Sequence, residues 1–185
     1  MYGQSMYRLA NLLYSIGRKQ EARGYYHQVG EQYRRQARMC PDWRAQTDLA
    51  RFLASCPFEE LRDPAEAVRA ASRAIELAPE ALVCRCVLGR AQYRIGDLQG
   101  AVHTLEHFNR HNDEEPSSFF FLSMSYWKLG NREQARRNFN QGMQRLGREK
   151  YPNLIDKQSG AEAAALLGIP EKSTTTAREA SSLKE

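Results

Sequence analysis

Apolar residues recur along this chain at the three- and four-residue spacing of amphipathic helices. Met6, Leu9 and Leu13 form one such stripe, and residues with this spacing share one face of a helix. Two stripes separated by a short break form a unit, and this unit occurs four times. We therefore predict four helix–turn–helix repeats, which span residues 1–41, 42–79, 80–113 and 114–151.

Glycines and capping residues mark the ends of the predicted helices. Gly17, Gly96 and Gly130 follow the first stripe of repeats one, three and four, and glycine readily adopts the left-handed conformation that ends a helix. In the second repeat, Asp42 is a predicted N-cap. Asp63 and the proline after it predict the start of the next helix. The connection before Asp63 is longer than in the other repeats.

The C-terminal part of the chain changes in character after the fourth repeat. A short apolar helix at 161–167, within the segment 152–170, is predicted to cover the open end of the array, because each repeat buries its apolar face only against its neighbours. Residues 171–185 are rich in Ser, Thr, Glu and Lys and contain no aromatic residue. This composition predicts a disordered tail.

The composition is that of an ordinary soluble protein. Of the 185 residues, 42% are hydrophobic and 26% are charged, with a formal net charge of +5. No apolar run approaches the roughly 18–20 residues that span a bilayer, and the N-terminus lacks the pattern of a secretory signal. We expect a soluble, cytoplasmic protein with no membrane partner. Its four cysteines have no disulfide or zinc spacing, so free thiols are expected.

The chain offers little catalytic chemistry. His103, His107 and His111 are spaced by four residues and share a helix face, where two histidines could hold a metal ion. No carboxylate or cysteine is placed to complete such a site, so a solvated face is the favoured interpretation. The sequence contains no phosphate-binding loop, dinucleotide fingerprint or nucleophile elbow. We predict no enzymatic activity, no metal and no cofactor.

The repeats resemble those of tetratricopeptide repeat proteins over residues 4–147. The fourth repeat matches the family pattern best, through Phe119, Leu122, Ser123, Tyr126, Gly130, Ala135 and Phe139. The resemblance implies an all-α, right-handed superhelical solenoid of about four repeats with a C-terminal capping helix. It also implies a non-catalytic scaffold or adaptor that binds a partner protein in a concave groove.

A narrower resemblance concerns residues 48–57, 62–64 and 74–79. These segments are similar to the tetratricopeptide regions of planctomycete-type bacterial multidomain proteins, many of which carry a serine/threonine kinase domain. The chain itself has none of the kinase signatures. This resemblance implies, as an alternative, a detached regulatory region of a bacterial kinase-type protein.

The family resemblance also implies which residues would bind a ligand, because the first helices of successive repeats line the groove. The positions that correspond are Tyr7, Asn11, Tyr14, Arg44, Arg51, Arg90, Tyr93, Arg94, Phe120, Met124, Trp127 and Lys128. Arginine binds carboxylates in a fork, and aromatic rings supply rigid contact area. We therefore expect an acidic and apolar peptide or helix as the partner. The alternative is that several of these side chains, Trp127 above all, pack between repeats.

Two further interpretations remain open from the sequence. The phosphates of RNA could be contacted by Arg34, Arg35, Arg38 and Arg44. Acidic residues interleave with the dispersed positive charge, so nucleic acid is not the expected partner. At the N-terminal edge, the stripe from Met6 to Leu13 has no preceding helix to cover it. This edge predicts either self-association or truncation from a larger protein.

Overall fold

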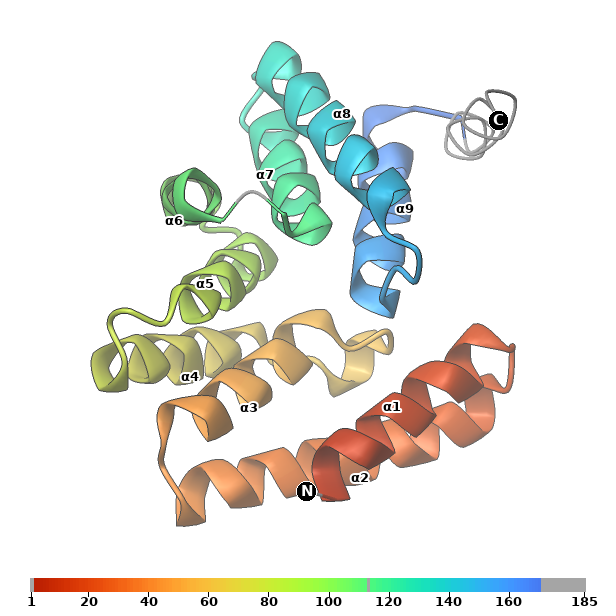
Figure 1. The fold of residues 1–185 in the computed structure, drawn as a ribbon, viewed down its shortest axis with the longest axis vertical. Coiled ribbons are helices and arrows are strands. Elements are labelled where there is room, and N and C mark those ends of the chain that lie inside the picture. The colour runs from red at the N-terminus through yellow and green to blue at the C-terminus, as the bar shows by residue number, and fades with distance from the viewer. Residues whose placement is uncertain (1, 113, 171–185) are drawn as a thin grey trace. The chain divides into compact units, whose positions relative to one another are not determined.

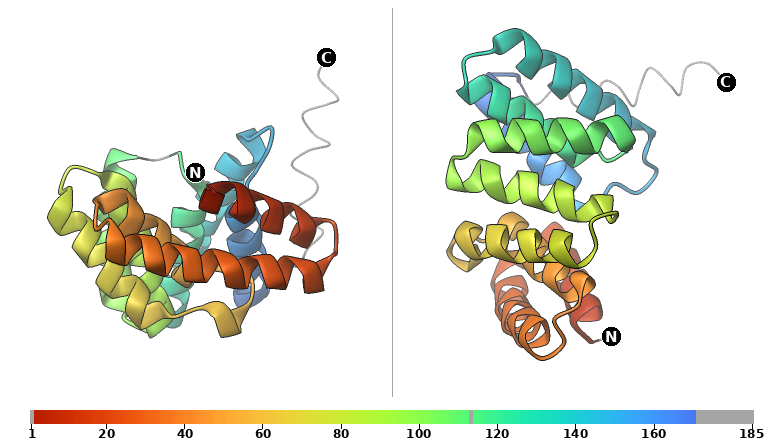
Figure 2. Two further views of the ribbon diagram at one scale, coloured as in Figure 1. Left: turned by 90° about the horizontal axis from the view of Figure 1, so that it is seen from below. Right: turned by 90° about the vertical axis from the view of Figure 1, so that its left-hand side faces the viewer.

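The computed structural model describes residues 2–112 and 114–170. In this part of the chain every regular element is a helix, nine of them α-helices and one a short 3₁₀ helix (Figures 1 and 2). The all-α class predicted from the periodicity is confirmed. The chain divides into two compact units, unit 1 (Met1–Gly96) and unit 2 (Asp97–Glu185). The boundary between them falls inside the predicted third repeat.

Unit 1 contains two helix pairs and one further helix. Within it, α1 packs on α2, α3 packs on α4, and α5 packs on both α3 and α4 (Figure 1). The connection between α3 and α4, expected from the sequence to be long, contains the 3₁₀ helix η1. The elements are α1 (Tyr2–Ser15), α2 (Lys19–Met39), α3 (Trp43–Ser55), η1 (Glu59–Leu61), α4 (Pro64–Leu77) and α5 (Leu82–Ile95).

The helix ends of unit 1 follow the predicted local signals. Gly17, two residues after the end of α1, has a φ of 84°, a conformation that other residues rarely adopt. The carboxylate of Asp42 accepts a hydrogen bond from the Ala45 amide at 2.7 Å, and that of Asp63 accepts one from the Glu66 amide at 2.8 Å. These bonds satisfy amide donors that a helix N-terminus leaves unpaired.

The core of unit 1 is built around aromatic rings. Tyr26 of α2 and Phe52 of α3 are almost completely buried, and the Phe52 ring packs edge-on against Tyr33 with centroids 6.0 Å apart. Tyr7 of α1 packs edge-on against Tyr26 at 5.9 Å. Burial of large rings supplies much of the apolar area that stabilises so small a unit.

Unit 2 is organised around α7 (Pro116–Lys128), whose residues 116–125 are all buried. Three helices pack against it: α6 (Leu98–His111), α8 (Arg132–Arg148) and α9 (Leu154–Leu167). A helix whose faces are all covered by neighbours is expected to carry few charged residues, and α7 has none before Lys128. The position of α7 therefore explains its run of aromatic residues.

The last helix is longer than the sequence pattern predicts. Its apolar part was expected at 161–167, but α9 begins at Leu154. Asn153 caps it by accepting the Asp156 amide at 3.0 Å, and the buried Asp156 carboxylate accepts the Ser117 amide at the start of α7. The first turns of α9 were missed because polar contacts rather than an apolar stripe hold them. The predicted disordered tail, 171–185, lies outside the described residues.

Candidate functional site

Unit 1 has a pocket of about 220 Å³ between α1, α2 and α3. The helices α1 and α3 are the first helices of the first two predicted repeats, so the pocket lies on the side where the family resemblance places a ligand groove. Two predicted groove residues, Tyr7 and Arg51, meet here. The lining residues are Gln4, Tyr7, Arg8, Tyr33, Asp48, Arg51 and Phe52.

Helical spacing brings these side chains to one place. Tyr7 and Arg8 follow Gln4 by three and four residues and therefore lie on the same side of α1. Arg51 and Phe52 follow Asp48 by the same spacings on α3. The rings of Tyr33 and Phe52 are buried and form the floor, whereas Gln4 and Arg8 are exposed at the rim. The result is an apolar floor with polar and charged walls.

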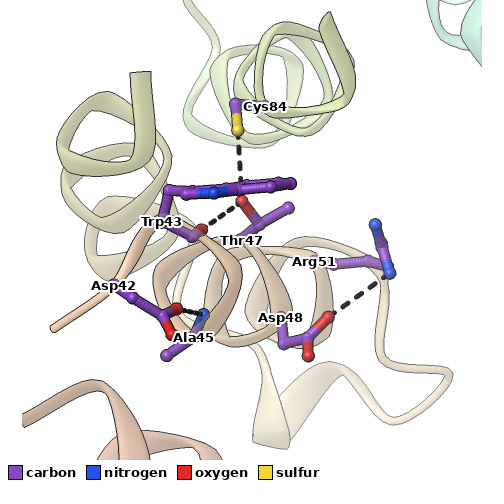
Figure 3. A network of polar contacts seen from close by, with 7 residues as sticks. All are labelled: Asp42, Trp43, Ala45, Thr47, Asp48, Arg51 and Cys84. Atoms are coloured by element: carbon purple, nitrogen blue, oxygen red, sulfur yellow. Dashed lines mark hydrogen bonds and ion pairs between the residues drawn. The ribbon is translucent and has the colours of Figure 1, made fainter. Parts of the chain in front are cut away.

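The walls carry two cations and one anion. Arg51 Nη1 lies 3.5 Å from Asp48 Oδ1 on the same helix (Figure 3), a long contact that leaves most guanidinium donors available. Arg8 makes no ion pair or hydrogen bond with the described part of the chain. The pocket therefore has a positive excess suited to a carboxylate.

Tyr7 contributes a neutral phenol. Burial raises its pKa to about 12, with a smaller opposing contribution from the Arg51 cation. At neutral pH the hydroxyl therefore stays protonated, and the ring lies edge-on to Phe52 at 6.5 Å. Its ring forms part of the apolar surface of the pocket, and its position is held by the aromatic core.

The other two predicted residues of α1 have structural roles. The Oδ1 of Asn11 accepts a hydrogen bond from the buried Tyr26 hydroxyl at 2.5 Å. Tyr14 packs edge-on against Phe58, with centroids 5.7 Å apart. Asn11 thus satisfies a core hydroxyl, and Tyr14 packs beside the connection that leads to η1. Neither lines the pocket.

The predicted groove residues of α3 do not all line the pocket. Arg44 is exposed, with its guanidinium carbon 4.5 Å from the centroid of the Trp43 ring, and it does not line the pocket. Thr47, which lies between Arg44 and Arg51 on α3, is buried: its hydroxyl donates to the Trp43 carbonyl at 2.6 Å and lies 3.2 Å from Cys84 Sγ of α5 (Figure 3). Thr47 therefore links helices instead of facing a ligand.

Several predicted groove residues are buried, so the expectation that they face a ligand is wrong. Arg90 and Tyr93 of α5 are 2% and 4% exposed, and Phe120 and Met124 of α7 are fully buried. For Phe120 the reason is plain: its ring packs against the backbone of Gly142 and Gly160. The family pattern assumes that a first helix has an open side, and α7 has none.

The remaining predicted residues are at least partly exposed. Arg94 is half-buried, with its guanidinium carbon 5.5 Å from the centroid of the Tyr93 ring. Trp127 is also half-buried, and Arg132 stacks on its ring at 3.6 Å. Lys128 is exposed at the end of α7. Trp127 therefore packs against a side chain of its own repeat and stays partly exposed.

The histidine stripe has no metal-binding arrangement. His103 and His111 are exposed, and the rings of His107 and His111 stack with centroids 4.8 Å apart. Across residues 2–112 and 114–170, no three His, Cys, Asp or Glu side chains converge as a metal site would require. Within the same ranges, no helix has the length and apolar character needed to cross a membrane.

Two segments of the chain match known repeat families. Residues 4–35, which cover most of α1 and α2, match a tetratricopeptide repeat family, and residues 116–145, in α7 and α8, match another. Both segments are tetratricopeptide repeats. The resemblance drawn from the sequence is thereby confirmed for the first and fourth predicted repeats. No curated protein matches the chain in sequence.

Solved structures support the same fold. A crystal structure of MamA shares 16% sequence identity with this chain, with a TM-score of 0.55, and covers 89% of this chain and 91% of its own. A second crystal structure of MamA protein, also 16% identical, has a TM-score of 0.57 and covers 95% of both chains. The fold is therefore all-α and of the tetratricopeptide type.

Proposed function

We propose that this protein is a non-catalytic interaction scaffold that binds a segment of a partner protein in the pocket between α1 and α3. Tetratricopeptide repeats generally act as protein-binding scaffolds, and helical repeats present extended binding surfaces. The observation that carries the proposal is the convergence of Tyr7 and Arg51 on one pocket with an apolar floor.

The side chains that line the pocket indicate which kind of peptide segment it would bind. Arg8 and Arg51 supply guanidinium donors for a carboxylate, and a hydrogen bond to a charged group contributes about 1.5–3 kcal/mol. The Tyr33 and Phe52 rings offer an apolar floor to a neighbouring side chain. We therefore expect the bound segment to place an acidic residue next to an apolar one.

A random peptide library displayed on phage tests this proposal even though the partner protein is unidentified. Selection on the wild-type protein should enrich peptides in which Asp or Glu adjoins a large apolar residue. A selected peptide should bind Arg51→Glu at least ten-fold more weakly. Arg35→Glu is the matched control, because Arg35 is exposed on α2 and does not line the pocket. Peptides that bind both variants equally, or that lack acidic residues, would contradict the proposal.

We also propose that the chain self-associates through α1, by way of the apolar side chains that the structure leaves exposed on this helix. Leu13 is buried, whereas Leu9, Leu12 and Ile16 of α1 are 39%, 57% and 59% exposed. This apolar stripe fits a second copy of the chain, which would offer the same stripe across a two-fold axis. Leu12→Glu should then remove any concentration dependence of the sedimentation coefficient, and a wild-type protein that is monomeric at all concentrations would contradict self-association.

Kinase regulation and RNA binding have less support than a peptide-binding scaffold. The similarity to kinase-linked repeat regions stays a prediction, because the repeat matches and the two MamA structures do not bear on it. RNA binding also stays untested. Of the arginines that suggested RNA binding, Arg34 is paired with Glu66 at 2.9 Å, which reduces its availability to phosphate.

A further inference from the structure

A second pocket, of about 400 Å³, lies in unit 2 between α6, α7 and α8. Its size is within the range of about 300–1,000 Å³ that is usual for ligand pockets. It is formed mainly by α6 and α8, the second helices of the predicted third and fourth repeats. The groove implied by the family resemblance is lined by first helices, so this α6–α8 pocket is a different site.

The floor of the α6–α8 pocket is apolar and fixed. Phe119 and Leu122 of α7 line it and are 4% and 3% exposed. The guanidinium of Arg145 lies over the Phe119 ring at 4.1 Å, and its Nη1 donates to the Gln141 carbonyl at 3.2 Å. This stacking holds one cation flat above the floor.

The walls add two more arginines from opposite sides. Arg110 projects from α6 and Arg137 from α8. Neither makes an ion pair or a hydrogen bond with the described part of the chain. Three guanidinium groups thus converge on a pocket about the size of a short peptide segment, and two of them have their donors available.

One carboxylate, Glu106, also lines the pocket, and it already has a partner. The Tyr126 hydroxyl donates a hydrogen bond to Glu106 Oε1. Burial, followed by this contact with Glu106, raises the pKa of Tyr126 to about 12, so the hydroxyl keeps its proton at neutral pH. Glu106 offsets only part of the charge of the three arginines, and the pocket stays positive.

We propose that the α6–α8 pocket binds an acidic segment of a protein. The carboxylates of this segment bind Arg110 and Arg137, and one of its apolar side chains packs on the floor of the pocket beside Arg145. The inference does not depend on the proposed pocket between α1 and α3.

A peptide fits this pocket better than a nucleic acid does. An apolar floor recognises apolar side chains, which a phosphate backbone does not offer. Proteins that bind DNA tightly neutralise about 6–10 phosphates along a strand, whereas here three arginines surround one small cavity.

The test uses a fluorescein-labelled peptide of sequence Asp-Glu-Leu-Asp-Glu-Phe-Asp-Glu and fluorescence anisotropy at physiological salt. Arg137→Glu should weaken binding at least ten-fold. Arg136→Glu is the matched control, because it makes the same charge change at the exposed neighbouring position of α8; it should change the affinity less than two-fold. Circular dichroism confirms that each variant is folded.

Several outcomes would overturn the inference. Equal losses for Arg136→Glu and Arg137→Glu would show general charge attraction, and a wild-type protein that does not bind the peptide would remove the site. Polyuridylate that binds with the same dependence on Arg137, while the peptide does not, would assign the pocket to nucleic acid. Loss of peptide binding in Arg51→Glu but not in Arg137→Glu would place the peptide in unit 1, which contradicts this inference and supports the proposed function.

Discussion

The ring of Phe120 occupies the space that a side chain at position 142 would need: a Cβ atom added to Gly142 would lie 2.7 Å from Phe120 Cε1. The same ring faces Gly160 of α9, where an added Cβ would lie 3.2 Å away. One aromatic side chain of α7 is thus enclosed by glycines of two other helices. Unit 1 contains a similar close contact between a glycine and an aromatic ring: a Cβ added to Gly30 of α2 would lie 2.7 Å from Phe52 of α3.

This close packing predicts opposite effects for two alanine substitutions in α8. Gly142→Ala should destabilise unit 2 by about 1–3 kcal/mol, since an added methyl group overpacks the Phe120 contact. Gly147→Ala, where nothing lies within 4 Å, should be neutral or stabilise by up to about 1 kcal/mol, because alanine favours a helix. Urea denaturation measures both, and equal midpoints for the two variants would contradict the role of Gly142.

The bond between Asn11 and Tyr26 predicts a stability effect at a residue first expected to bind a ligand. Asn11→Ala leaves the buried Tyr26 hydroxyl without its acceptor and should cost about 1–3 kcal/mol. Tyr26→Phe in the same background should recover part of this loss, because it removes the unpaired hydroxyl. Chemical denaturation of the single and double variants measures the coupling. An additive result would mean that the two side chains do not interact.

The tyrosines of unit 1 predict a loss of stability in alkaline solution. Burial raises the pKa of Tyr7 to about 12, and it raises those of Tyr26 and Tyr33 as well. Folding therefore favours the protonated phenols, and this stabilisation is complete below pH 10, the ordinary tyrosine pKa. It is lost as the pH rises from 10 towards 12, by an amount on the order of 1–3 kcal/mol for Tyr7.

The free energy of unfolding measured between pH 8 and pH 11.5 tests this dependence. Tyr7→Phe should lower the slope above pH 10 while it leaves the stability near pH 8 little changed. A wild-type protein whose stability is constant through pH 11.5 would show that Tyr7 titrates normally.

Burial also predicts which cysteine reacts first. Cys40 is exposed, whereas Cys56, Cys84 and Cys86 are buried, and desolvation raises the pKa of the Cys56 thiol to about 11. Because the thiolate is the reactive form, iodoacetamide at pH 8 should modify Cys40 at least ten-fold faster than the other three. Peptide mass mapping measures the rates, with denatured protein as the control in which all four react. Rapid modification of Cys56 in the folded protein would contradict its burial.

Much of the fold could be predicted from local signals. Gly17 and the caps at Asp42 and Asp63 specify helix ends through backbone conformation and nearby hydrogen bonds, and these depend on only a few neighbouring residues. The start of α9 could not be found in this way, because Asp156 is held by a contact with Ser117, far away in the sequence.

The candidate site was predicted only in part, for a related reason. Tyr7 and Arg51 lie on first helices with an open side, and both line the pocket there. Phe120 lies on a first helix that α9 covers, and this cover is a tertiary contact that helical periodicity does not reveal. Arg110 and Arg137 look like solvated surface residues in the sequence, and only the packing of α6 against α7 and of α7 against α8 brings them to one pocket.

Photo-crosslinking from the rim of the α1–α3 pocket shows where a peptide binds. The photoreactive residue p-benzoylphenylalanine would replace Gln4, which is exposed at the rim, or, as the control, Gln36, which is exposed on α2 outside the pocket. A peptide selected from the library should crosslink from position 4 and not from position 36, and excess unlabelled peptide should suppress the product. Crosslinking with equal yield from both positions, or from position 36 alone, would contradict a binding site between α1 and α3.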